Sequence, residues 1–478
     1  MTETILREIP YTPELEQPLA KSRQRISETG RILVSKKGWA LRGLMLTATA
    51  VFMIYNFSIA LSVGDVLIIY STVMLTQALA PFVIGWVRFR NRGTGEIPED
   101  LVSVIIPVYN QQNLIEKVLD AVFTSTYPNL EVVAVNDGSK DGTAQILDEY
   151  ARKNPQLKVI HKPNGGKRTA AARGFYAARG DFLVFIDSDS IIDKYAIEEI
   201  MKTFAANPKV GGVVCHGKVL NSGHNWLTKC QDTWYDYSFN IEKATESTFG
   251  TVLCLSGLGA AYRRQAIARF MGFWAKDQFP FGDDRHLTTY VMATPWAKRE
   301  LAPVETRLMD FMASYDDAED RGLTSQAMAV EWETVYAPTA LAYTEVPETP
   351  KKYFKQQLRW KKAYLRTSFF VSAFFWRKNP VMAFLFYMQF MGAFLGPAIL
   401  FTIFVYGPLV LHSYLYTFTY LAAQLLIGAV ISVDYKLRDP AAKHWMYMPI
   451  MNLLSSLVLS WLVFPAVFGI KKKGWLTR

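Results

Sequence analysis

The stretch DFLVFIDSDS, Asp181 to Ser190, changes from apolar to acidic within a few residues. Leu183 to Ile186 is an apolar run suited to a buried strand, and Asp187 and Asp189 follow it at alternate positions. An isolated acidic pair of this kind is usually a turn with solvated side chains. Whether these two acids form a ligand-binding site or an ordinary turn therefore depends on the sequence around this stretch.

The polar block from Leu101 to about Pro347 alternates strand-like and helix-like segments. LEVVAVNDGS is typical of a strand that ends at Asp137. In the same way, the strand expected in DFLVFIDSDS ends at Asp187. Strands separated by helices predict a parallel α/β sheet with right-handed crossovers, in which ligands bind beyond the carboxyl ends of the strands. The helices between the strands are expected at Leu114 to Phe123, at Thr143 to Arg152 and over KRTAAARGFYAAR.

Three clustered acids, Asp137, Asp187 and Asp189, would repel one another unless a positive charge joins them. Mg²⁺ or Mn²⁺, held by one or two carboxylates together with diphosphate oxygens, supplies such a charge. The basic segment GGKR, with Lys167 and Arg168, adds cations near the same edge. NGGK lacks the spacing of a P-loop, so an ATPase is excluded.

Long uncharged windows flank this block. Each is long enough to cross a bilayer, which needs about 20 apolar residues, and the third is long enough for two crossings. The sequence therefore predicts an integral membrane protein with the lipid bilayer as a partner. The windows are Leu44 to Val63, Val66 to Val87, Val381 to Val433 and Trp445 to Ile470.

Basic residues next to the windows predict the orientation. Arg42, Arg88, Arg377 and Arg438, among others, flank the windows and would face the cytoplasm by the positive-inside rule. A single crossing by the last window would place the cluster Lys471–Lys473 on the other side. We therefore expect a re-entrant or hairpin segment there, broken near Pro465.

The remaining composition fits a multi-pass membrane protein, which we expect in the plasma membrane. The first 40 residues are polar and show no signal peptide. The 3 cysteines lack metal-ligand spacing and are expected to be free thiols. The net charge of +10 is explained by juxtamembrane residues facing anionic lipid, so no nucleic acid partner is expected.

Two further motifs are candidates for a ligand site, although SGLGAAYRR taken alone is better interpreted as an ordinary turn. SGLGAAYRR, with Ser256, Gly257 and Arg264, has small residues that allow close approach to a flat ligand, although an ordinary turn would look alike. In QQLRW, Gln356, Arg359 and Trp360 share one helix face, where Arg suits phosphate and Trp suits a sugar ring. A basic helix lying on the membrane surface is the alternative.

Together these motifs resemble the processive family 2 glycosyltransferases, particularly hyaluronan synthases and chitooligosaccharide synthases, and more distantly cellulose synthase. The resemblance covers roughly Leu101 to Phe370 and is carried by VSVIIPVYN, VNDGS, GGKR, DSD, SGLGAAYRR, FGDDRHLT, VYAPTALAYTEVPET, QQLRW and GWLTR. It implies a GT-A type cytosolic domain on an α-helical transmembrane region. The implied activity is inverting transfer from a UDP-sugar donor to a growing polysaccharide, which the protein would secrete through its own channel.

The resemblance also implies roles for individual residues. Asp137 and Asp187 would lie at the nucleotide and Asp189 would bind the metal. Lys167 would bind the diphosphate, with Arg168, Ser256, Gly257 and Arg264 as further substrate contacts. Gln356, Arg359 and Trp360 would close over diphosphate and acceptor.

The general base has two candidates. Asp284 in FGDDRHLT follows AAYRR at the distance expected in the family, whereas Asp320 in AEDRGLT precedes TVYAPTA by the expected helix length. The family pattern lacks an insertion between such motifs, which here lies near 294–318. Asp284 is the preferred candidate for the general base, and Asp320 is kept as the second candidate.

The expected domains follow from these segments. They are a cytosolic segment 1–40, two transmembrane helices in 41–92, the GT-A domain 93–348, interface helices 349–379, a transmembrane region 380–470 and a cytosolic tail 471–478. Two alternatives compete: a non-processive enzyme that adds one sugar to a lipid carrier, and a membrane scaffold or transporter with a degenerate nucleotide fold. The transporter is disfavoured because the windows contain no acid.

Overall fold

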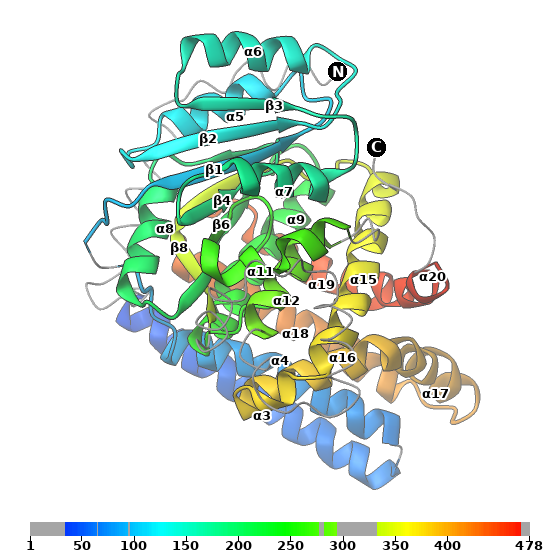
Figure 1. Ribbon diagram of the computed structural model, residues 1–478. Helices are drawn as coiled ribbons and strands as arrows, with labels where there is room; N and C mark the ends of the chain where they lie inside the picture. The colour runs from blue at the N-terminus through cyan, green and yellow to red at the C-terminus, as the bar shows by residue number, and fades with distance from the viewer. Residues whose placement is uncertain (1–33, 65, 94–95, 277–281, 294–331, 470–478) are drawn as a thin grey trace.

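A mixed eight-stranded sheet forms the centre of the polar block in the computed structural model of this chain (Figure 1). The structure describes residues 34–64, 66–93, 96–276, 282–293 and 332–469. Asp320, the insertion near 294–318, most of the segment 1–40 and the tail 471–478 lie outside the described residues. The strand order is β3-β2-β1-β4-β7-β6-β8-β5. The strands are β1 Val102–Val108, β2 Leu130–Asn136, β3 Leu157–His161, β4 Phe182–Phe185, β5 Ser190–Ile192, β6 Val210–Val219, β7 Ala260–Arg263 and β8 Glu333–Thr344.

The prediction of a parallel sheet is correct for part of the sheet only. β3, β2, β1 and β4 are parallel neighbours, and β6 is parallel to β8. β7 runs antiparallel to β4 and β6, and β5 runs antiparallel to β8. The chain passes from β4 to β5 through Ile186–Asp189 with no helix between them, so the predicted alternation of strands and helices does not hold here.

Helices cover the sheet and bury its apolar strands. Every residue of β1, β2 and β4 is buried, as expected for strands covered on both faces. The three expected helices begin and end within two residues of the predicted bounds. The helices of this part are α5 Ile115–Phe123, α6 Thr143–Lys153, α7 Lys167–Ala177, α8 Ala196–Ala206, α9 Trp226–Tyr237, α10 Ala244–Thr248, α11 Arg264–Lys276 and α12 Asp283–Ala293. α9 and α10 are joined by a π-helical turn, Ser238–Lys243.

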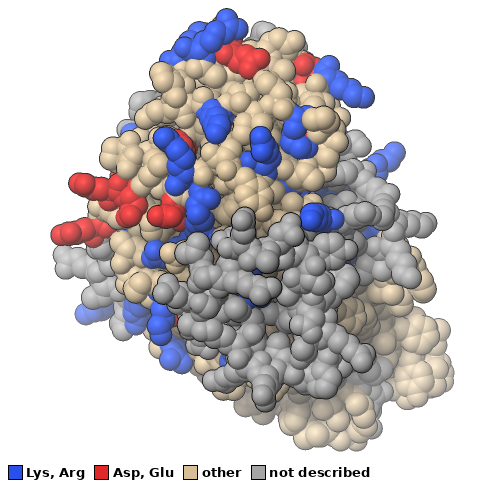
Figure 2. All heavy atoms as spheres, viewed as in Figure 1, with Lys and Arg blue, Asp and Glu red and all other residues tan. Residues whose placement is uncertain are grey.

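Three described helices are long and apolar enough to cross a membrane: Lys36–Ser62, Pro380–Leu409 and Leu415–Arg438. They belong to α3 (Lys36–Val63), to α16 (Pro380–Phe401) with its continuation into α17 (Gly407–Leu409), and to α18 (Leu415–Arg438). α4 (Val66–Val87) lies beside α3 below the sheet domain (Figure 1). In Figure 2 charged side chains gather on the upper part of the visible face, whereas its lower right edge, around α17, shows none.

The last apolar segment is a bent pair of helices. Trp445–Leu457 and Leu459–Phe468 meet at 42°, which fits either a broken span or a re-entrant loop. The break lies at Val458, before the short turn Leu459–Leu462, rather than near Pro465 as expected. Pro465 lies in the first turn of α20 (Val463–Phe468), where its missing N–H breaks no helical hydrogen bond. α19 (Met448–Leu457) packs on α18 and on α9.

A buried chain of ion pairs joins the apolar helices to the sheet domain. Arg42 in α3 donates to Asp434 Oδ1 in α18 at 2.7 Å, and Arg438 Nε donates to Asp434 Oδ2 at 2.7 Å. Arg438 Nη1 then reaches Asp236 Oδ1 in α9 at 3.1 Å. The side chain of Asp434 is fully buried. Arg42 and Arg438, which the sequence places next to the apolar windows, are therefore buried in the protein.

Candidate active site

Asp137 organises the loop before α7. It follows β2 directly, and only 3% of the residue is exposed. Its carboxylate accepts the backbone N–H groups of Gly165 and Gly166 at 2.9 and 2.8 Å, and the Lys162 ammonium donates to it as well. Gly166 has φ 91°, a conformation that a residue with a side chain rarely adopts. Asp137 thereby fixes the loop that precedes Lys167. A contact between Asp137 and the nucleotide stays a prediction.

Lys167, Asp187 and Asp284 meet at the carboxyl ends of β1, β2 and β4. Lys167 begins α7, and its ammonium pairs with Asp187 and lies 3.6 Å from Asp284 Oδ1. Burial disfavours the charged form of Lys167, but the carboxylates of Asp187 and Asp284 outweigh burial and raise its pKa. Lys167 therefore stays an ammonium and can neutralise further negative charge at this edge.

Gly257 lies between the two carboxylates. Its N–H donates to Asp284 Oδ2 at 2.9 Å, and its carbonyl accepts the N–H of Asp187 at 2.8 Å. A Cβ atom at this position would come within 2.8 Å of Asp284 and 2.9 Å of Asp187. The small residue of SGLGAAYRR is thus required by the packing of two acids, and not only by the approach of a ligand. Ser256 precedes it in the same loop and is half-buried.

Asp284 lies in the first turn of α12 and is held in the site by its backbone. Thr288 Oγ1 donates to the Asp284 carbonyl at 2.6 Å and accepts the N–H of Leu255 at 3.0 Å, which ties α12 to the loop of Gly257. Burial, reinforced by Asp187 and opposed by Lys167, raises the pKa of Asp284 to about 6. A carboxylate with this pKa is ionised at neutral pH and accepts a proton more readily than an ordinary aspartate.

Arg168 and Arg264 were both predicted to contact the substrate, but in the structure both have protein partners. Arg168 Nε donates to Asp283 Oδ1 at 2.6 Å, and its guanidinium lies 5.6 Å from the ring centroid of Trp274. Only 7% of the Arg168 side chain is exposed, so it positions the start of α12 rather than offering a free charge.

The structure gives Arg264 backbone carbonyls as partners, and its predicted role in substrate binding stays a prediction. Arg264 Nη2 donates to the carbonyls of Ala178 and Gly180 at 2.9 and 2.8 Å. Its backbone N–H donates to the Asp181 carbonyl at the start of β4. Because β7 runs antiparallel to β4, the end of β7 lies at the edge of the sheet opposite to Asp187.

The QQLRW segment is helical, as predicted, and lies in α15 (Pro350–Ser372). Trp360 stacks on Trp234 of α9, with ring centroids 5.7 Å apart and an interplanar angle of 23°. Gln356 Oε1 is buried and has no hydrogen-bond partner within the described part of the chain. A buried acceptor of this kind is costly unless a donor reaches it, so it points to a ligand at this helix face.

Tyr235 is a residue of this site that the motifs did not indicate. It is buried, and burial raises its pKa, with the charges of Asp189, Arg359 and Asp187 acting on it as well. Tyr235 therefore lies near both the acidic strand end and the arginine of QQLRW. The aromatic run TWYDY in α9 is the only signal in the sequence, and aromatic residues in a helix usually fill a core.

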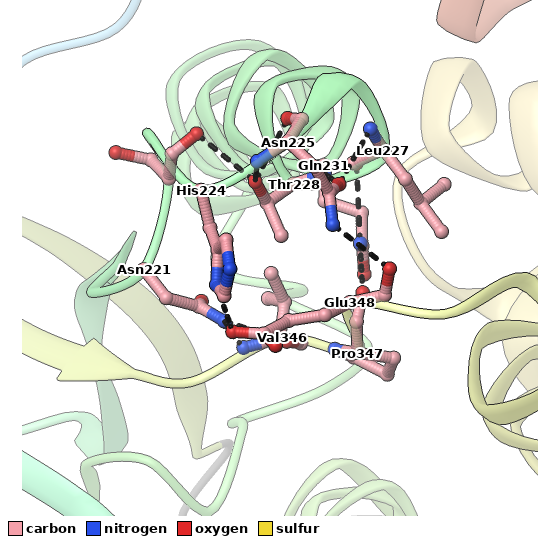
Figure 3. Close-up of polar contacts among 10 residues, drawn as sticks. Asn221, His224, Asn225, Leu227, Thr228, Gln231, Val346, Pro347 and Glu348 are labelled. Atoms are coloured by element: carbon pink, nitrogen blue, oxygen red, sulfur yellow. Dashed lines mark hydrogen bonds and ion pairs between the residues drawn. The ribbon is translucent and has the colours of Figure 1, made fainter. Parts of the chain in front are cut away.

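A cluster of polar contacts positions the start of α15 (Figure 3). Asn221 Nδ2 donates to the Val346 carbonyl at 2.9 Å, and Asn225 Nδ2 donates to the Glu348 carbonyl at 2.9 Å. His224 Nδ1 lies 2.6 Å from Glu348 Oε1. Thr349 then caps α15 by accepting the N–H of Lys352. The segment between β8 and α15 is thereby fixed to α9, which carries Trp234 and Tyr235.

The acids at this edge can hold only part of a metal's coordination shell. No three His, Cys, Asp or Glu side chains within the described ranges gather closely enough to bind an ion by themselves. Asp189 directly precedes β5, whose first residue pairs with Thr344 of β8. Mg²⁺ and Mn²⁺ commonly take one or two carboxylates together with substrate oxygens, so this donor set fits a metal that arrives with a diphosphate.

Comparison with known proteins shows what the sheet domain is similar to. Residues 103–270 match the model of the family "Glycosyl transferase family 2". The chain is 27% identical to hyaluronan synthase of Streptococcus pyogenes over 424 residues, which cover 86% of this chain and 90% of that protein. It is 31% identical to an N-acetylglucosaminyltransferase of Rhizobium meliloti, over 60% of this chain and 61% of that protein.

Among solved structures, the chain is similar to a mannosyltransferase of Pyrobaculum calidifontis in complex with GDP-Man and Mn²⁺. That similarity has a TM-score of 0.48 with 19% identity, and it covers 81% of this chain and 97% of the other. The predicted resemblance to family 2 glycosyltransferases of the hyaluronan and chitooligosaccharide synthase type is confirmed by the family match and the two relatives.

Proposed function

Because the chain carries a glycosyl transferase family 2 domain, we propose that it is a membrane-embedded, processive, inverting enzyme that polymerises UDP-activated sugars. The product would be hyaluronan-like or chitin-like and would leave through the protein's own transmembrane helices. Similarity to a hyaluronan synthase over 86% of the chain supports this proposal, since it includes the apolar helices as well as the sheet domain.

The observation that carries the proposal is the convergence of Asp187, Lys167 and Asp284 around Gly257. Asp284 is the proposed general base. It would take the proton of the acceptor hydroxyl as the hydroxyl oxygen bonds to the anomeric carbon of the donor. The bond between that carbon and the diphosphate oxygen would break at the same time, so that UDP leaves and the configuration inverts.

The other residues would bind the donor and the acceptor. Lys167 and Arg359 are proposed to neutralise the diphosphate, and Asp187 to orient Lys167. Gln356, whose carbonyl oxygen is buried without a partner in the described part of the chain, would accept from a hydroxyl or amide of the substrate. Trp360 would contact the acceptor with the part of its ring that Trp234 does not cover.

Asp189 is the proposed protein ligand of Mg²⁺ or Mn²⁺, since it lies at the strand-end loop next to Asp187. When bound, the metal would supply charge that stabilises the departing diphosphate. The sheet domain is proposed to face the cytoplasm at the plasma membrane, where UDP-sugars are present. Basic residues that border the apolar helices, such as Lys36 and Arg377, support this orientation.

UDP release by the purified full-length protein tests this function. We expect release from at least one UDP-sugar with Mn²⁺ present, loss of release in excess EDTA, and a polymeric product. Transfer of a single sugar to a lipid would instead identify the non-processive alternative. Absence of UDP release from every donor and donor pair would refute the proposal.

A further inference from the structure

The loop of residues 250–257 connects α10 to β7 and ends at Gly257 of the candidate site. At its start the loop pairs with β8. At its end α12 holds it, because Asp284 Oδ2 accepts the N–H of Gly257 at 2.9 Å and Thr288 Oγ1 accepts the N–H of Leu255 at 3.0 Å. The other side of the loop is held by α10 and by the π-helical turn that precedes α10.

Lys243, the last residue of the π-helical turn, holds the middle of this loop. Its ammonium donates to the Cys254 carbonyl at 2.7 Å, and only 7% of the residue is exposed. Close by in the chain, Glu246 Oε2 accepts the N–H of Leu253 at 3.1 Å. Two neighbouring residues of the loop are therefore fixed by side chains of one helical segment.

The packing of this region does not by itself require a lysine. Burial of an ammonium group costs free energy, and a methionine of similar length would fill the same space without that cost. The carboxylates of Glu242 and Glu246 offset part of it: burial raises their pKa values, and the charge of Lys243 opposes this rise. What the lysine adds to the fold is the hydrogen bond to the loop.

The π-helical turn is itself anchored to the sheet and to the apolar helices. Asn240 Nδ2 donates to Asp236 Oδ1 at 2.7 Å, and Asn240 Oδ1 accepts the hydroxyl of Tyr336 in β8 at 3.0 Å. Asp236 belongs to the buried chain of ion pairs through Arg438. Lys243 therefore extends toward the loop from a segment whose own position is fixed on two sides.

We propose that Lys243 is a positioning residue for the transfer reaction, because its hydrogen bond holds the loop of residues 250–257 so that the Gly257 N–H stays directed at Asp284. This inference rests on the proposed function, in which Asp284 is the general base. A hydrogen bond from Gly257 favours the ionised carboxylate, which is the form that accepts a proton. Without the bond from Lys243 the loop is held from α12 alone at this point, and the Gly257 N–H is free to move away from the carboxylate.

The proton affinity of Asp284 reports the position of this loop. Burial raises the pKa of Asp284, Lys167 lowers it, Asp187 and Asp283 raise it, and the Gly257 N–H lowers it. Movement of the loop away from α12 weakens the contribution of Gly257, so the pKa of Asp284 should rise further. The acidic limb of kcat/KM, which follows the protonation of the base, should then move to higher pH.

Lys243→Met in the purified full-length protein tests this inference. The acidic limb of kcat/KM for UDP release should move up by about 0.5 to 1 pH unit, the effect of partial loss of a hydrogen bond to a charged group. The plateau value of kcat should fall about tenfold, because the base is less well placed. KM for the UDP-sugar should stay within about threefold, since Lys167 and Arg359, the proposed partners of the diphosphate, lie on α7 and α15.

Three further variants separate positioning from charge and from stability. Thr288→Val removes the hydroxyl that holds the same loop at Leu255 without any change of charge, and it should move the limb in the same direction. Lys243→Arg keeps a charged donor and should leave the limb near its wild-type position. Lys202→Met removes an ion pair with Glu198 in α8, and it should lower Tm without moving the limb.

The possible outcomes are distinct. A lower Tm in Lys243→Met with an unchanged limb would make Lys243 a structural residue only and overturn the inference. A shift in Lys243→Met without one in Thr288→Val would assign the effect to the charge of the ammonium and overturn it as well. If Lys243→Met does not fold, Lys243→Gln decides by the same criterion, because its amide is too short to reach the Cys254 carbonyl.

Failure of the inference differs from failure of the proposed function. A wild-type profile without an acidic limb would overturn the positioning role while UDP release and polymer formation persist. Absence of UDP release by wild type from every donor would instead refute the proposed function, on which the inference rests.

Discussion

Replacement of Asp284 by asparagine tests the proposed base with little change in shape. The amide oxygen of the introduced side chain can still accept the Gly257 N–H, which lies 2.9 Å from Asp284 Oδ2, so α12 should keep its position. Loss of proton acceptance should lower the rate of transfer by about 10²- to 10⁴-fold. UDP affinity should stay within about threefold, because the proposed base faces the acceptor hydroxyl and not the nucleotide.

The same substitution should not destabilise the protein. The folded state raises the pKa of Asp284 from 3.8 to about 6, so the ionised carboxylate costs folding free energy above this range. Two pKa units correspond to about 2.7 kcal/mol, which we reduce to about 1 kcal/mol because 33% of the side chain is exposed. Asp284→Asn should therefore match or exceed wild type in Tm at pH 7.5.

The pH dependence gives a third readout. Below pH about 6 Asp284 takes up a proton, so kcat/KM of wild type should fall as the pH is lowered through this value. The free energy of unfolding should instead rise as the pH is lowered from 6 to 4, because the folded state binds the proton more tightly than the unfolded state. Asp284→Asn should lose the acidic limb of the rate profile.

Asp283→Asn is the matched control. It changes the neighbouring acid, which accepts from Arg168 Nε at 2.6 Å, and should cost about 1.5 to 3 kcal/mol of stability. The acidic limb of the rate profile should remain but move to lower pH, because the charge of Asp283 helps to raise the pKa of Asp284. If Asp284→Asn retained more than about a tenth of the wild-type rate, or lost UDP binding together with transfer, Asp284 would not be the base. Asp320, outside the described residues, would then be tested in the same way.

Three further predictions concern the metal, the diphosphate and the ion-pair chain. Asp189→Asn should remove Mn²⁺-dependent transfer but keep the wild-type thermal unfolding curve, and retained activity would contradict its assignment as metal ligand. Arg359→Ala should weaken UDP binding by about 10- to 100-fold in titration calorimetry, whereas a helix that only anchors to lipid would leave this affinity unchanged. Arg438→Met should leave the buried Asp434 and Asp236 short of a partner, lowering the free energy of unfolding by about 3 to 5 kcal/mol, and an unchanged Tm would show that other groups satisfy these acids.

Much of the sheet domain could be predicted because its signals are local. Apolar runs such as Leu183 to Ile186 specify buried strands, and their spacing by amphipathic helices specifies the crossovers. The meeting of Asp187 with Lys167 follows from this topology, since both flank the carboxyl ends of parallel strands. The direction of β7 and β5 was less accessible because an isolated short strand carries no signal for its orientation.

Contacts between distant segments were the least predictable. Asp434 lies one residue beyond an uncharged window and was not expected inside the protein, yet α18 continues past it to Arg438. Its burial depends on Arg42, 392 positions earlier in the chain, and no local pattern relates the two residues. Tyr235 belongs to the same class, because it gains its significance from residues of other elements.

Pulse-chase sizing of the product tests the central proposal, processive polymerisation, most directly. The purified protein in vesicles would be given radiolabelled UDP-sugars briefly, followed by an excess of unlabelled donor. Our account predicts that the labelled chains stay bound and grow into long polymer during the chase, with no accumulation of short intermediates. Label that remains in lipid-linked or free sugars of one or two units, with no growth during the chase, would contradict it.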